Sequence, residues 1–227
     1  MLKPVENRRY WFVLVVQSFL FFVAPFTREY PSLLLVFIFG LLGVFGTVIH
    51  TIWKARLPRL LAICTAAVAL ATGVMAFPDM RFEEPVISYL MACCVAYAAF
   101  ILIAIVSIGA DVLFRESVTL DCIWGSISVY MFLGMFFAFL FGFLVFLAPE
   151  AFDHTTRAGS PGRLRLNDLL YFSYSTLTTT GYGDIAPSHP FARTLANFES
   201  IVGTLDIAVM ISRLVSLHVA EKDMAKP

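Results

Sequence analysis

The chain has 227 residues, of which 59% are hydrophobic and only 14% are charged, and its formal net charge is zero. Soluble domains hold about 45–50% apolar residues, and a chain this short has too small a core to bury such an excess. The composition therefore excludes a soluble globular protein, and the balanced charge predicts no nucleic-acid partner.

Five apolar runs of 17–27 residues follow one another along the chain, each near the roughly 20 residues that a helix needs to cross a bilayer, and a sixth, which hydropathy alone leaves in doubt, comes after them. They cover residues 10–26, 31–53, 60–77, 86–110, 122–148 and 190–219. Asp, Glu, Lys and Arg occur only in the sixth run. We predict an all-α integral membrane protein with six transmembrane helices in the lipid bilayer.

Basic residues indicate the orientation of these helices. Lysine and arginine gather before the first run, after the second and after the fourth: Lys3, Arg8, Arg9, Lys54, Arg56, Arg59 and Arg115. An excess of Lys and Arg is typical of cytoplasmic loops. We therefore expect a multi-pass protein of the cell membrane with both termini in the cytoplasm.

The four cysteines lie within apolar runs or at their ends, at positions 64, 93, 94 and 122, and none has the spacing of a metal site. We interpret them as reduced packing residues. No nucleophile, base and orienting group recur at a usable spacing, so we expect neither an enzyme nor a cofactor.

The connection between the fifth and sixth runs carries the most informative sequence. It opens with the turn-rich residues 158–162, and Asn167 or Asp168 then offers an N-cap for a helix over 168–178. This helix is too short to cross a bilayer, so it must enter and turn back. Irregular backbone at that depth is tolerated only where protein buries it or where it lines water.

Residues 178–185 read TTTGYGDI and resemble the selectivity filter of potassium channels. The resemblance extends over residues 122–219, with Pro187 and Pro190 before the last run and Arg193 near its start. It implies a reentrant pore helix and a filter between helices five and six. It also implies a homotetramer, because one chain supplies one filter segment, and a filter mouth on the extracellular side.

The resemblance assigns roles to individual residues. The carbonyl groups of Thr179, Thr180, Gly181 and Tyr182 would bind K⁺ as the permeant ion, and Gly183 would complete the filter. The expected supporting residues are Ser175, Thr178 and Asp184. Gly203, twenty residues after Gly183, stands where the family places a gating hinge.

Three departures from the family pattern lie close to the filter. Thr180 replaces the more frequent Val and adds a hydroxyl group behind the strand. Ser175 stands where some members have a Glu that bonds the filter aspartate, and Tyr171 and Phe172 replace a pair of Trp residues. The alternative of a channel with weaker selectivity between K⁺ and Na⁺ therefore stays open.

We divide the chain into a four-helix N-terminal membrane domain at 1–121, a pore domain at 122–220 and a short cytoplasmic tail at 221–227. A voltage sensor needs Arg or Lys at every third position of its fourth helix, and run 86–110 has no charged residue. The first four helices are then a structural collar or a sensor of lipid or ligand. The sequence names no gating ligand.

Glu199, Asp206 and Arg213 are spaced by seven residues, so they share one stripe of the last helix. Asp206 faces either the ion cavity below the filter or a neighbouring helix, where it would be hydrogen-bonded or paired with Arg213.

The predicted function is passive, potassium-selective conduction by a tetrameric pore. Two alternatives are a weakly selective cation channel and a non-conducting membrane subunit that modifies a partner channel.

Overall fold

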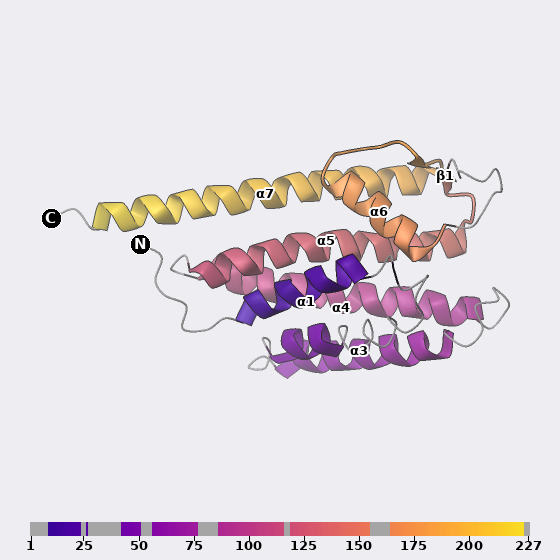
Figure 1. Cartoon of the computed structure of the whole chain (residues 1–227), viewed down its shortest axis with the longest axis horizontal. Coiled ribbons are helices and arrows are strands. Elements are labelled where there is room, and N and C mark those ends of the chain that lie inside the picture. Colours follow the sequence, from indigo (N-terminus) through magenta and orange to yellow (C-terminus); the bar gives the residue numbers. More distant parts are fainter. Residues whose placement is uncertain are drawn as a thin grey trace. The chain divides into compact units, whose positions relative to one another are not determined.

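The structure is a computed structural model that describes residues 9–23, 26, 42–50, 56–76, 86–115, 119–154 and 164–224. These residues are mostly helical (Figure 1). The elements in chain order are α1 (Arg9–Val23), α3 (Arg56–Ala76), α4 (Val86–Phe114), α5 (Leu120–Leu147), β1 (Phe152–His154), α6 (Leu166–Leu177), β2 (Ile185–Pro187) and α7 (Pro190–Met224). Residues 42–50 are also helical.

Three helices of the described residues are long and apolar enough to cross a membrane: Ser88–Phe114, Leu120–Leu147 and Pro190–Arg213. They correspond to the fourth, fifth and sixth predicted runs. In the first run the helix α1 covers residues 10–23, residues 24–25 lie outside the described residues, and so does most of run 31–53. The presence of six spanning helices therefore remains a prediction. The predicted turn at residues 158–162 also remains one, because these residues lie outside the described part of the chain.

The chain forms two compact units. One consists of Met1–Arg59, Ala104–Phe132 and Leu205–Pro227, and the other of Leu60–Ile103 and Leu133–Thr204. Helices α4, α5 and α7 each contribute one part to either unit. The division into a four-helix domain, a pore domain and a tail stays a prediction.

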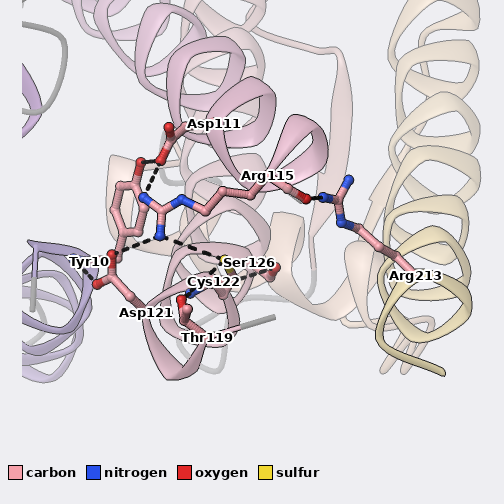
Figure 2. A network of polar contacts seen from close by, with 8 residues as sticks. All are labelled: Tyr10, Asp111, Arg115, Thr119, Asp121, Cys122, Ser126 and Arg213. Atoms are coloured by element: carbon pink, nitrogen blue, oxygen red, sulfur yellow. Dashed lines mark hydrogen bonds and ion pairs between the residues drawn. The ribbon is translucent and has the colours of Figure 1, made fainter. Parts of the chain in front are cut away.

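A polar network organises the first unit (Figure 2). The Arg115 guanidinium lies 2.7 Å from the Asp111 carboxylate and 3.5 Å from that of Asp121. Its Cζ lies 5.8 Å from the centre of the Tyr10 ring, and the Tyr10 hydroxyl donates to Asp111 at 2.5 Å. The Arg213 side chain of α7 donates to the backbone carbonyl of Arg115. The start of α1, the α4–α5 connection and α7 are thereby joined.

Arg115 stays charged in this network. Burial, the largest single effect, lowers the pKa of its guanidinium, but the attraction of the Asp111 carboxylate together with Cys122 and Tyr10 outweighs it, and the net pKa is raised. A permanent positive charge therefore holds the two aspartates.

Aromatic residues form the core of the second unit. Phe141, Phe152 and Phe172 meet edge to face with ring centres 5.1–5.6 Å apart, which is a favoured arrangement of aromatic rings. They come from α5, β1 and α6, and α7 adds the buried Ala192 and Ala196. Figure 1 shows α6 between α5 and α7.

The second unit also contains a small antiparallel sheet of β1 and β2, which the sequence did not predict. In it Phe152 pairs with Pro187, Asp153 with Ala186 and His154 with Ile185. The backbone N–H groups of Ser188 and His189 also donate to the Ala151 carbonyl, at 3.0 and 3.2 Å. The chain after the filter-like segment is therefore tied to the end of α5.

Candidate functional site

The half-length helix expected before the filter-like segment is α6, Leu166–Leu177. Its N-cap is Arg165 and not Asn167 or Asp168, so that prediction was wrong. The reason is that Asp168 sits three positions into the helix, where its carboxylate accepts the Arg165 backbone N–H at 2.9 Å. An acidic group in the first turn also suits the helix dipole.

Helix α7 packs closely on the last turn of α6. A Cβ atom added at Gly203 would lie 2.7 Å from Leu177 Cδ1 and 2.8 Å from the Leu177 carbonyl oxygen. Ser200 Oγ donates to the Thr176 carbonyl at 3.0 Å. Glycine at position 203 therefore has a packing reason, whether or not it also serves as a hinge.

The backbone of the filter-like segment has an unusual alternation. Thr179, Gly181 and Gly183 have φ of 57°, 58° and 81°, whereas Thr180 and Tyr182 between them do not have positive φ. Glycine adopts such angles without steric penalty, but a β-branched residue at positive φ is a true outlier. Strained backbone of this kind tends to occur at functional sites.

Ser175 anchors this segment from inside α6. Its carbonyl accepts the backbone N–H groups of Thr180 at 2.8 Å and Gly181 at 3.2 Å. Its hydroxyl accepts the Tyr182 N–H at 3.4 Å. The predicted supporting residue thus lies against the segment, and it contacts the backbone where the family's Glu would contact the aspartate.

The hydroxyl group that Thr180 adds has a partner. Thr178 Oγ1 and Thr180 Oγ1 are 2.8 Å apart, and Thr178 Oγ1 also donates to the Tyr174 carbonyl at 2.7 Å. Because the Thr178 hydrogen is used for Tyr174, Thr180 is the donor of the pair.

Asp184 is held by Tyr171, a role that the sequence reasoning missed. The Tyr171 hydroxyl donates to Asp184 Oδ1 at 3.2 Å, and the Tyr171 and Tyr182 rings stack with centres 5.7 Å apart. Tyr171 was noted only as a replacement for Trp. A hydroxyl-bearing aromatic residue two turns before the end of the half-helix was the available signal.

Residues 178–184 are all exposed in the single chain. Among the described residues, no side chain lies within 4 Å of a Cβ atom added at Gly181 or Gly183. Among the described residues no group of three His, Cys, Asp or Glu side chains is placed to hold a metal ion. The polar groups that the site offers are therefore mainly those of its backbone.

The charged residues that share one stripe of α7 contact other parts of the same chain or are buried in it. Glu199 is fully buried and contacts Ser173, and Arg213 donates to Arg115. Asp206 lies between them, and its Oδ2 is buried without a hydrogen-bond partner among the described residues. The expected pairing of Asp206 with Arg213 is not among the contacts of either side chain.

Known proteins match the part of the chain that holds this site. A sequence model of the family described as "Ion channel" matches residues 127–219. Protein LctB of Bacillus caldotenax is 33% identical over 98 residues, which is 43% of this chain and 72% of that protein. Protein LctB of Geobacillus stearothermophilus is 30% identical over 107 residues, which is 47% and 79% of the two chains.

A third relative is the inward rectifier potassium channel Kirbac3.1 of Paramagnetospirillum magnetotacticum, 36% identical over 69 residues, which is 30% of this chain and 22% of that protein. No solved structure matches the chain significantly. The region matched by the family model runs from α5 through α6 and the segment 178–184 into α7. The helices of membrane length confirm the coarse prediction of a helical membrane protein. The chain belongs to the ion channel family.

Proposed function

We propose that this chain is the pore-forming subunit of a potassium-selective channel. Four copies contribute the carbonyl groups of Thr179, Thr180, Gly181 and Tyr182 to a common axis, with Gly183 at the outer end. These oxygens replace the hydration shell of a passing K⁺ ion. K⁺ is the cargo, and conduction needs no cofactor and no covalent chemistry.

The backbone alternation from Thr179 to Gly183 is the observation that carries this proposal. In an ordinary strand successive carbonyl groups point to opposite sides. Alternate residues of left-handed and ordinary conformation turn the carbonyl groups toward the same side. The positive φ of Thr179 supports a function here, because a β-branched residue adopts it only where the surroundings impose it.

The exposure of the single chain supports a tetramer. Backbone polar groups at membrane depth need partners, yet residues 178–184 are exposed. Within its membrane-length part α7 is only 17% buried, against 61% for α5. Neighbouring copies around an axis would cover part of α7 and enclose the filter.

The arrangement of the chain in the membrane is part of the proposal. Six helices span the cell membrane, both termini are cytoplasmic and the filter mouth is extracellular. Thr178, Ser175 and Asp184 support the filter, and the C-terminal end of α6 points its dipole at the cavity, which favours a cation there.

Two further roles concern α7. Gly203 is the hinge of the gate as well as a packing residue. Asp206, whose Oδ2 is buried in the single chain, would turn its carboxylate toward the axis in the assembly and so line the cavity. Asp206→Asn then lowers block by internal magnesium or spermine; unchanged block with normal conductance would remove this role.

The test is a flux assay on the purified protein in liposomes with rubidium, sodium and external barium. The proposal predicts rubidium uptake, much smaller sodium uptake and inhibition by barium. Equal uptake of both ions would instead indicate the weakly selective channel. No uptake at all would favour the non-conducting subunit.

A further inference from the structure

Glu199 is a fully buried acidic residue in the middle of α7. Among the described residues it forms no ion pair, and its Oε2 has no hydrogen-bond partner. Asp121 shows the contrast, because this buried carboxylate accepts the Tyr10 N–H at 3.0 Å and lies 3.5 Å from the Arg115 guanidinium. An ionised carboxylate buried without a partner is strongly unfavourable.

The contacts of Ser173 show where a proton must be. Ser173 Oγ lies within hydrogen-bond distance of Glu199 Oε1 and 2.6 Å from the Gly134 carbonyl oxygen. A serine hydroxyl has one hydrogen, and a carbonyl oxygen has none, so Ser173 donates to Gly134. The bond between Ser173 and Glu199 then needs its hydrogen from Glu199, which must be a neutral carboxylic acid.

This chain of hydrogen bonds from Glu199 through Ser173 to Gly134, called the relay below, joins three helices close to the proposed filter. Glu199 belongs to α7, Ser173 to α6 and Gly134 to α5. Ser173 is fully buried, five residues before Thr178. Two residues further along α6, Ser175 holds the backbone of Thr180 and Gly181. The relay therefore fixes the part of α6 from which the filter is anchored.

Resting on the function proposed above, we infer that Glu199 is a positioning residue of the filter. As a neutral acid it donates to Ser173 Oγ, and Ser173 donates to the Gly134 carbonyl, so that α6 is fastened to both α5 and α7. A movement of α7 is thereby passed to α6 and to the filter segment.

Infrared difference spectroscopy of the purified full-length protein tests the proton directly. Comparison of the wild type with Glu199→Gln should reveal a protonated carboxyl stretch that shifts in D₂O. Glu150→Gln, which alters an exposed carboxyl group at the end of α5, is the matched control and should show no such band. If Glu199→Gln differed from the wild type only by the loss of bands of an ionised carboxylate, the inference would be overturned.

Rescue by the conservative variant tests the positioning role. Glu199→Gln keeps a neutral donor, so its rubidium flux and barium inhibition should stay within about twofold of wild type. Glu199→Ala and Ser173→Ala leave a buried polar group unpartnered and should lower flux by about tenfold. Ser126→Ala is the serine control, because the Ser126 hydroxyl donates to the Cys122 carbonyl of its own helix at 2.9 Å.

The outcomes separate the two proposals. If wild-type protein carries no flux, the proposed function fails, and the infrared band with the thermal unfolding of the same four variants still decides the relay. Equal loss of flux or stability in Glu199→Gln and Glu199→Ala would contradict the neutral donor.

Discussion

At the scale of single residues, Thr180 shows how a departure from the family pattern fits the structure. Its hydroxyl group donates to Thr178 Oγ1, so it is held within the segment. The extra oxygen therefore braces the segment, and this arrangement favours retained selectivity.

We predict that Thr180→Val keeps potassium-selective flux. Thr178 retains its bond to the Tyr174 carbonyl, so only one neutral hydrogen bond is lost, which costs about 0.5–1.5 kcal/mol. The checks are the rubidium-to-sodium flux ratio and the thermal unfolding temperature. Thr194→Val, which removes a hydroxyl bonded within α7 to the Pro190 carbonyl, is the control. A collapse of the flux ratio in Thr180→Val alone would count against the bracing role.

Gly203 leads to a second prediction at this scale. In Gly203→Ala the new methyl group meets the Leu177 carbonyl oxygen at 2.8 Å, and backbone atoms cannot yield as a flexible side chain does. We expect the free energy of unfolding to fall by about 1–3 kcal/mol and the rubidium flux to be reduced.

The matched control is Gly109→Ala. Position 109 lies inside α4, and a Cβ atom there has nothing within 4 Å. Alanine in a helix is favoured over glycine by roughly 0.5–1 kcal/mol, so this variant should be neutral or more stable. Equal unfolding temperatures for the two variants would show that close packing at Gly203 is unimportant.

The filter residues could be predicted from the sequence, because they form one contiguous motif that can be recognised without knowing the fold. It did not predict the partners of Tyr171 or Ser173. Those contacts join α6 to residues 13 and 26 positions away, and only the packing of helices brings them together.

At the scale of elements, hydropathy located the long helices well, because an apolar run near 20 residues has few other solutions. Predicted run 122–148 corresponds to Leu120–Leu147. Run 190–219, which hydropathy alone left in doubt and the family resemblance assigned, is part of Pro190–Met224. Strands β1 and β2 escaped prediction, since each has three residues and depends on a partner about 30 residues away.

The network around Arg115 gives a prediction about how elements are held together. Asp121→Asn removes the negative charge that faces Arg115 and leaves the acceptor for the Tyr10 N–H. We expect the free energy of unfolding to fall by about 1–3 kcal/mol, because a buried hydrogen bond between charged groups is broken. Thermal unfolding of the detergent-solubilised protein measures it.

Asp153→Asn alters an exposed carboxylate on β1 and provides the control. Its unfolding temperature should equal that of the wild type. If Asp121→Asn were equally silent, the network would contribute nothing to joining α1 with the α4–α5 connection.

At the scale of the whole molecule, the account requires four chains around one axis. Native mass spectrometry in detergent should find a particle of four copies of the 25.3 kDa chain. The physical reason is that one chain offers a single filter segment, and an enclosing ring of carbonyl groups needs several. A monomer or dimer as the largest species would contradict the assembly.

The central claim is that backbone oxygens from Thr179 to Tyr182 select K⁺. Its most direct test is the reversal potential of the purified protein in a planar bilayer with opposed K⁺ and Na⁺ gradients. The account predicts a current that reverses close to the K⁺ equilibrium potential. A reversal midway between the two equilibrium potentials, or a bilayer that stays silent, would contradict it.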